Sequence, residues 1–271
     1  MNPGGKGANQ AVAASRLGGD VTFICKIGND LFGQQAHLLF EKENIDTSYI
    51  FSDPEHASGV ALIVVDDEAE NCITVASGAN AYLTPEDIRS AGKAVEEAGI
   101  ILIQLEIPLE TVLYVAELAL QKEKKLILNP APAQQLPSSL MNGLYLITPN
   151  ETEAEMISGI RITDQDSALR AASVISGMGV QHVIITLGDQ GALLYDQARA
   201  LFLPALNVQA VDTTAAGDVF NGTLAVALSK GEKWIDAIEF ACHASAISVT
   251  RLGAQSSIPY EQEVLSFLSH S

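Results

Sequence analysis

Runs of apolar residues alternate along this chain with stretches whose apolar positions recur at helical spacing. The apolar runs occupy residues 21–27, 99–105, 125–128, 144–147 and 182–186. The helical stretches occupy residues 9–17, 31–43, 108–121, 168–177 and 220–228. A strand that is apolar at nearly every position is typical of one buried on both faces. The alternation therefore predicts an α/β fold, with a parallel sheet and helices on both of its faces.

One stretch departs from this alternation. Residues 59–65 and 71–76 are two strand-like segments, and the acidic residues 66–70 lie between them with no helical stretch. This pattern predicts a β-hairpin. Hairpins decorate the surface of many α/β domains, and the pattern alone gives this one no further role.

Polar residues follow four of the predicted strands. They are Glu106, Asn129, Thr148 and Thr186. Ligands of open α/β sheets bind beyond the carboxyl ends of the strands. We therefore expect these four positions to lie around one shared cleft.

Length and composition are those of a globular protein. The 271 residues are 48% hydrophobic and are predicted to form a single α/β domain, 1–271. No apolar run reaches membrane-spanning length, and Met1 precedes a glycine-rich segment instead of a signal peptide, so no membrane partner is expected. Cys25, Cys72 and Cys242 lack metal-binding spacing, which favours reduced thiols in the cytoplasm.

The charge balance excludes one class of partner. With 15 basic and 33 acidic residues the net charge is −18, which argues against nucleic acid. A nucleotide site would need its own local positive potential. Lys6, a helix N-terminus and a bound Mg²⁺ would supply it, because salt screens distant charges beyond roughly 8–10 Å.

The segment 211–222 carries the clearest chemical pattern. Ala215, Ala216 and Gly217 would place backbone N–H groups at the start of a helix, without bulky side chains in the way. Unpaired N–H groups and the helix dipole both favour a bound anion. Asp218 follows at once, as expected of a base that takes a proton from a hydroxyl attacking a phosphate. The alternative is an ordinary helix start whose acidic residue complements the dipole.

The same segment, Asp-Thr-Thr-Ala-Ala-Gly-Asp, resembles the signature of the ribokinase (phosphofructokinase-B) family of carbohydrate kinases. Further segments resemble that family's motifs and follow its order. They are Gly4-Gly5-Lys6-Gly7-Ala8-Asn9-Gln10-Ala11, Gln104-Leu105-Glu106, Asn129-Pro130-Ala131-Pro132, Thr148-Pro149-Asn150-Glu151-Thr152-Glu153, Thr186-Leu187-Gly188-Asp189-Gln190-Gly191 and Val249-Thr250-Arg251-Leu252-Gly253-Ala254-Gln255. The resemblance implies a ribokinase-like three-layer α/β fold with a small β lid, of which residues 57–78 form part.

The resemblance assigns a sugar site to one group of residues. It implies that the sugar is bound by Gly5, Lys6, Asn9, Glu106 and Asp218, and that catalysis rests on Asp218 with Ala215, Ala216 and Gly217. Glycines let the backbone approach a ligand closely, and Asn9 offers both a donor and an acceptor to hydroxyls. Without the family, the glycine-rich segment would be an unordered chain end and Glu106 an exposed acid.

The resemblance also implies ATP and Mg²⁺ as cofactors. The residues near ATP would be Asn150, Glu153, Thr186, Gly188, Gly191, Gly217 and Cys242. Glu153 would hold Mg²⁺ through water, since Mg²⁺ keeps part of its hydration shell, and Cys242 would be a small apolar wall beside the adenine. Simpler explanations stay open, with Asn150 as a helix N-cap and the glycines as requirements of a turn.

A monovalent-cation site is implied next to the anion site. Its ligands would come from Asp212, Thr214, Ser248, Arg251, Gly253 and Ser257, through carboxylate, carbonyl and hydroxyl oxygens. A set of oxygen ligands without nitrogen or sulfur suits a hard cation such as K⁺. The family further implies a homodimer formed through the lid.

The expected activity is ATP-dependent phosphorylation of D-ribose to D-ribose 5-phosphate. Alternatives are another sugar or nucleoside kinase of the family, such as a fructokinase or deoxyribokinase, and a non-catalytic relative that only binds sugar or nucleotide. The presence of Asp218 argues against the last. Family members begin with a strand ending in Asn-x-Asp, whose aspartate binds the sugar, and this sequence begins at the later glycine-rich segment. Whether as a fragment or through a late start assignment, the 271-residue chain is expected to have reduced stability and little activity.

Overall fold

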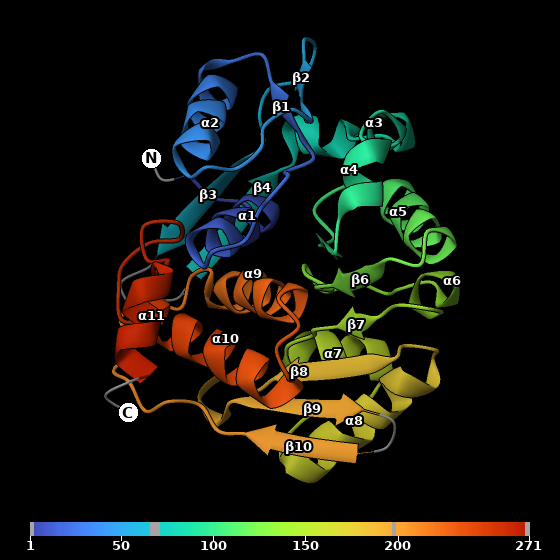
Figure 1. The fold of residues 1–271 in the computed structure, drawn as a ribbon, viewed down its shortest axis with the longest axis vertical. Helices are drawn as coiled ribbons and strands as arrows, with labels where there is room; N and C mark the ends of the chain where they lie inside the picture. The colour runs from blue at the N-terminus through green and yellow to red at the C-terminus, as the bar shows by residue number, and fades with distance from the viewer. Residues whose placement is uncertain (1–2, 66–70, 197–198, 269–271) are drawn as a thin grey trace.

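The main sheet has six strands in the order β10-β9-β8-β7-β6-β5 (Figure 1). The computed structural model describes residues 3–65, 71–196 and 199–268. The strands are β5 (Ile100–Ile103), β6 (Lys125–Leu128), β7 (Leu146–Ile147), β8 (His182–Thr186), β9 (Ala192–Asp196) and β10 (Arg199–Leu203). The parallel pairing predicted from the sequence is confirmed for β5 to β8.

The two remaining strands of this sheet run the other way. β9 pairs antiparallel with both β8 and β10, whereas the sequence analysis expected a parallel sheet. The reason is the short connection from β8 to β9, a 3₁₀ turn η2 (Gly188–Gln190) followed by Gly191 with φ +99°. A parallel crossover needs a dozen or more residues. A connection as short as this one can only reverse the direction of the chain.

Two small sheets complete the strands. β1 (Cys25–Gly28) and β2 (Ile50–Asp53) pair in parallel, with α2 (Leu31–Lys42) between them in the chain. β3 (Val60–Val65) and β4 (Asn71–Ala76) pair antiparallel, which confirms the predicted hairpin. Its predicted turn, residues 66–70, lies outside the described residues.

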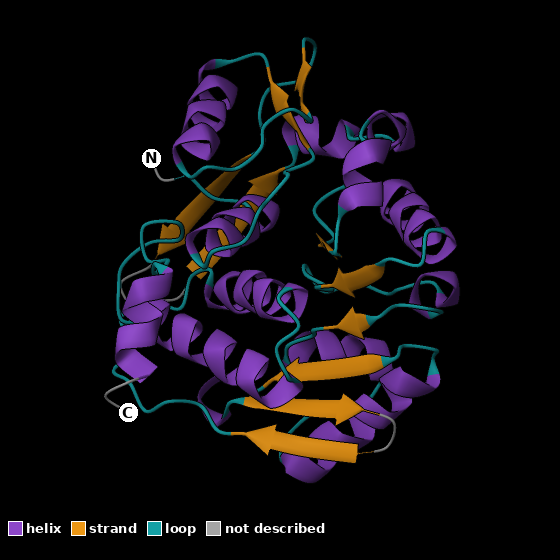
Figure 2. Ribbon diagram, in the orientation of Figure 1, coloured by secondary structure: helices purple, strands orange, loops and turns teal. Residues whose placement is uncertain are grey.

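Helices cover both faces of the main sheet (Figure 2). They are α1 (Lys6–Arg16), α3 (Pro85–Ser90), α4 (Gly92–Glu97), α5 (Leu109–Gln121), α6 (Ser138–Met141), α7 (Glu151–Ser158), α8 (Gln165–Gly177), α9 (Ala216–Ser229), α10 (Trp234–Val249) and α11 (Glu261–Leu268), with a further 3₁₀ helix η1 (Gly78–Tyr82). Alternate residues of one strand enter opposite cores. On β8, Ile184 packs with α9 and α10, while Val183 and Ile185 pack with α5 and α8. The three central residues of β8 are therefore apolar because both faces of the strand are buried.

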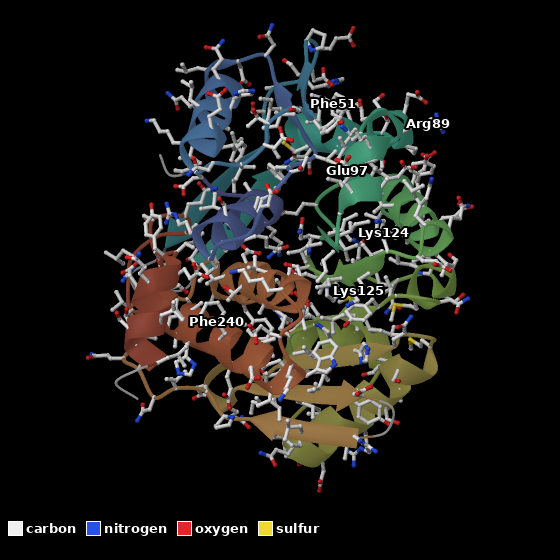
Figure 3. The ribbon with its side chains drawn as sticks, in the orientation of Figure 1. Phe51, Arg89, Glu97, Lys124, Lys125 and Phe240 are labelled. Carbon is white, nitrogen blue, oxygen red and sulfur yellow. The ribbon has the colours of Figure 1, made fainter. Side chains whose placement is uncertain are left out.

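A third core lies between α1, α9 and α10. Phe240 of α10 packs against both this core and the core under α9 (Figure 3). The backbones of α1 and α9 approach closely at Gly222, where a Cβ would lie 2.5 Å from the Gln10 carbonyl oxygen and 2.8 Å from the Ala13 Cβ. This approach brings the first two turns of α1 beside the start of α9.

We expect Gly222→Ala to lower the free energy of unfolding by about 1–3 kcal/mol, because an added methyl must force apart two packed backbones. Chemical denaturation of both proteins measures the difference. The matched control is Gly177→Ala at the end of α8, where a Cβ meets nothing within 4 Å. That variant should be as stable as the parent, or more stable by up to about 1 kcal/mol through helix propensity. Equal stability of Gly222→Ala and the parent would contradict this account of the α1–α9 contact.

Candidate active site

Asp218 is the third residue of α9 and its side chain is buried, with 6% of the residue exposed. Its carboxylate accepts hydrogen bonds from two side-chain amides of α1, Asn9 Nδ2 at 2.9 Å and Gln10 Nε2 at 3.0 Å. Each amide reaches a different carboxylate oxygen. The carboxylate is thus held at a helix start by donors from a second helix.

The environment of Asp218 changes its affinity for a proton. Burial raises the pKa of the carboxyl group above its ordinary value, and the charge of Glu106 raises it further. The charge of Lys6 and the hydrogen bonds from Asn9 and Gln10 act in the opposite direction, lowering this pKa. A raised pKa makes a carboxylate a better proton acceptor, which suits a general base.

The start of α9 has the backbone geometry of an anion site. Its N-cap, Ala215, has a left-handed backbone with φ 63°, and Ala216 donates its N–H to the Thr213 carbonyl at 3.2 Å. Gly217 and Asp218 follow as the second and third helical residues, whose N–H groups have no acceptor within the helix. These N–H groups lie at the positive end of the helix dipole.

The glycine-rich segment lies beside Asp218. Lys6 donates its backbone N–H to Glu106 Oε2 at 2.8 Å, and Gly5, with φ 99°, faces the same carboxylate. Asn9 is 5% exposed, and its Oδ1 is buried without a hydrogen-bond partner. The structure therefore brings together all five residues predicted to bind a sugar, and leaves one buried acceptor for a ligand to satisfy.

A second group of predicted residues gathers at the ends of β7 and β8. Asn150 and Thr186 form a parallel β-bridge, in which Thr186 N–H donates to the Pro149 carbonyl at 3.0 Å. Asn150 caps α7: its Oδ1 accepts from Glu153 N–H at 2.8 Å, and its own N–H donates to Glu153 Oε2 at 2.9 Å. Burial raises the pKa of Glu153, whose carboxyl group also feels the charges of Lys6 and Asp218. Glu153 thus lies on the side of the site that faces Asp218.

A cavity of about 330 Å³ lies beyond the antiparallel strands. It is lined by Leu203, Pro204, Ala205, Leu206, Glu239, Cys242, His243 and Leu268. Gly191 brings the β8–β9 turn against this lining, since a Cβ there would lie 2.0 Å from the Leu203 carbonyl oxygen; Gly188, before it, also has a left-handed backbone with φ 56°. Burial raises the pKa of the Cys242 thiol to about 11, so the side chain is a neutral wall of the cavity.

Hydrogen bonds to backbone groups connect the residues predicted to bind a cation. Asp212 Oδ1 accepts from Thr214 N–H at 2.9 Å and Oδ2 from Gly253 N–H at 2.8 Å. A hydrogen bond from the Thr214 side chain, followed by these two backbone bonds, lowers the pKa of Asp212. Hydrogen bonds also hold the other predicted ligands. Arg251 N–H donates to the Ser248 carbonyl at 3.1 Å, and Ser257 Oγ donates to the Ala254 carbonyl at 2.7 Å. Within the described ranges, no group of three or more His, Cys, Asp or Glu side chains could hold a metal ion. The oxygen donors that are present fit a hard monovalent cation.

Sequence analysis placed Asn129 at the shared cleft but gave it no partner, and it assigned no role to Gln10 or Gln104. Gln10 Nε2 donates to Asp218 and also to Asn129 Oδ1 at 3.0 Å, and Gln104 Nε2 donates to Gln10 Oε1. Gln10 adjoins Asn9 in the glycine-rich segment, and Asn129 and Gln104 lie at strand ends. These sequence positions could have marked the three residues as parts of the site. The partners of their side chains, however, are set by the packing of the folded chain.

Two further observations concern regions outside this site. A groove of about 460 Å³ is lined by Pro85, Leu109, Glu110, Leu113, Tyr114 and Glu117, between α3 and α5, and contains none of the residues above. In the part of the chain that the structure describes, no helix is both long enough and apolar enough to cross a membrane.

Comparison with known proteins places this arrangement among sugar kinases. Residues 1–261 match the model of the pfkB family carbohydrate kinases. The chain is 45% identical to the ribokinase of Haemophilus influenzae, over 99% of this chain and 88% of that protein. It is 37% identical to the deoxyribokinase of Salmonella typhi, over 98% and 87% of the two chains. The structure of Arabidopsis thaliana ribokinase complexed with ribose and ATP superposes with a TM-score of 0.92 at 28% identity, covering 99% of this chain and 88% of that one.

The fold of the described residues is accordingly ribokinase-like, as the sequence predicted. With a family match over nearly all of its length and a relative of 45% identity, the chain belongs to the pfkB family of carbohydrate kinases.

Proposed function

We propose that the protein transfers the γ-phosphoryl group of ATP to the 5-hydroxyl of D-ribose, giving D-ribose 5-phosphate and ADP. The observation that carries the proposal is the buried Asp218 carboxylate at the start of α9, held by Asn9 and Gln10 next to Lys6 and Glu106. The high identity to a protein named ribokinase supports ribose as the sugar.

In the proposed reaction Asp218 takes the proton of the 5-hydroxyl as its oxygen bonds to the γ-phosphorus, and the bond from that phosphorus to the β–γ bridging oxygen breaks. The N–H groups of Ala215, Ala216 and Gly217 would stabilise the negative charge on the transferred group. Ala216 would exchange its present bond to the Thr213 carbonyl for the phosphoryl oxygen.

The sugar would lie between the glycine-rich segment and Glu106. The buried Asn9 Oδ1 without a partner would accept a hydrogen bond from a sugar hydroxyl. Glu106, whose Oε2 already accepts from Lys6 N–H, has further lone pairs for sugar hydroxyls. Gly5 supplies backbone close to the ligand without a side chain.

ATP would extend from Asp218 toward the 330 Å³ cavity. Asn150 and Thr186 lie at adjacent strand ends for the phosphates, Gly188 and Gly191 shape the next turn, and Cys242 would lie beside the adenine. Mg²⁺, when bound with the nucleotide, would offset the charge of the phosphates. Glu153, a buried carboxylate near this position, fits a role in holding the ion through water.

A monovalent cation, K⁺, would bind at the loops that carry Asp212 and Gly253. We include Thr214, Ser248, Arg251 and Ser257 among its ligands, through carbonyl and hydroxyl oxygens. The cation would act by holding the segment just before Ala215 and would not contact the sugar.

The hairpin β3–β4 would cover the sugar as a lid and join two copies of the chain into a homodimer in the cytoplasm. Exposed apolar residues on the hairpin, Val60 at 45% and Val75 at 59%, support a role in covering another surface. The 1–271 chain would act as one domain with this lid attached.

A coupled assay for ADP release, run with D-ribose, 2-deoxy-D-ribose and D-fructose, tests the proposed activity. We expect kcat/KM to be highest for ribose. A higher value for 2-deoxyribose would replace ribose with the substrate of the deoxyribokinase relative.

The variant Asp218→Asn tests the role of this residue, because asparagine keeps the shape of the side chain but cannot act as the base. We expect kcat to fall by roughly 10²–10⁴-fold with little change in the KM for ATP. Turnover close to that of the parent would rule out Asp218 as the base.

Potassium is expected to raise the activity more than sodium, and both more than tetramethylammonium at equal ionic strength. Asp212→Asn should raise the half-saturating K⁺ concentration, because it removes the only charged ligand of the proposed set. Melting temperatures in K⁺ and in tetramethylammonium supply a readout independent of turnover, and the parent should gain stability in K⁺ where Asp212→Asn does not. The control for loss of charge is Asp236→Asn, an exposed residue in the first turn of α10. Equal rates and equal melting temperatures in all three salts would contradict the cation site.

A further inference from the structure

Gln10 is almost fully buried, 1% exposed, and its amide contacts three side chains from three other segments. Its Nε2 donates to Asp218 Oδ1 and to Asn129 Oδ1, at 3.0 Å each. Its Oε1 accepts from Gln104 Nε2. Both protons of the amide nitrogen and the amide oxygen are therefore engaged.

The direction of these bonds is fixed by the ionised carboxylate. An ionised Asp218 can only accept, so Gln10 must turn its Nε2 toward it. The Gln10 Oε1 then faces Gln104, which must donate through its own Nε2. This places Gln104 Oε1 against Gly7, 3.0 Å from where a Cβ would stand. Asn129 is held by its own donor, Nδ2, which bonds to the Thr148 carbonyl at 3.2 Å.

We propose that Gln104 and Gln10 form a directional relay of amides that positions the Asp218 carboxylate and favours its ionised form. Both are positioning residues: Gln10 acts on Asp218 directly, and Gln104 acts only through Gln10. The proposal rests on the proposed role of Asp218 as the base.

The electrostatic consequence has a definite sign. The charged groups that face Asp218 are Lys6 of α1, Glu106 after β5 and Glu153 of α7. Against burial and the two carboxylates, the Gln10 donor lowers the pKa of Asp218. Removing this donor must therefore raise that pKa, and the base would lose its ionised form at a higher pH than in the parent.

The first test compares Gln10→Met, Gln104→Met and the double variant in the full chain, because methionine keeps the length of glutamine without its polar atoms. The acidic limb of kcat/KM against pH should move upward by about one pH unit in Gln10→Met, a tenfold change in proton affinity. Gln104→Met should shift it in the same direction by less, since Gln10 keeps its donor but loses the bond that orients it.

The decisive comparison is the double variant. If Gln104 acts through Gln10, adding Gln104→Met to Gln10→Met produces no further shift of the limb. The control is Gln121→Met, whose amide bonds to Glu117 on the exposed face of α5, and its pH profile should match the parent. An unshifted limb in Gln10→Met, or additive shifts in the double variant, would overturn the relay.

Melting temperatures test the relay without turnover. The donor stabilises the folded protein only where Asp218 is ionised, so the loss of melting temperature in Gln10→Met should shrink as the pH falls through the folded-state pKa of Asp218. In an Asp218→Asn background the loss should not depend on pH. The same pH dependence in both backgrounds would overturn the relay. Active Asp218→Asn enzyme together with the expected melting pattern would instead reject Asp218 as the base and leave the relay standing.

Discussion

Placing an ionisable carboxylate out of water at the start of α9 is the constraint to which the rest of the site is fitted. An isolated charge in such a position is costly, so it must be paired or hydrogen-bonded. Asn9 and Gln10 supply the donors and Lys6 supplies a positive charge, all from one helix. They reach Asp218 because α1 packs against α9 at backbone distance, and Gly222 permits that distance.

The opposite end of α1 is also fixed. Arg16 donates Nε to Glu43 Oε2 at 2.8 Å, and its Nη1 donates to the carbonyls of Gln255 at 2.9 Å and Ile258 at 2.8 Å. These two carbonyls belong to the loop after α10, which also contains Gly253, the partner of Asp212. One helix thus links the segment around Asp218 to the loop that supports the residues before α9.

The sequence could predict those helices, strands and contacts that depend on the local pattern of apolar and polar residues. β6 and β8 have the predicted bounds, and their central residues are apolar and buried on both faces of the sheet. Asn150 and Thr186 meet, as expected of neighbouring strand ends. The sequence allowed a turn at Gly191, but it did not reveal that this turn would make β9 antiparallel to β8. The three side-chain partners of Gln10 lie 94, 119 and 208 positions away in the chain, so only the packing of α1 on α9 and the sheet defines them.

The hairpin β3–β4 belongs to neither of the other two sheets, since among the described residues its strands pair only with each other. Its root is held where Asp30 accepts from Ser58 N–H at 2.7 Å and from Ser58 Oγ at 2.8 Å, and where Ala79 N–H donates to the Ala57 carbonyl at 2.8 Å. The described hydrogen bonds at this root join the hairpin to the segment that carries Asp30 and do not involve the ladder of the six-stranded sheet. Asp30 and Ser58 lie outside the two strands, so the residues that anchor the hairpin differ from those that form its surface, and each set can change in sequence without altering the other.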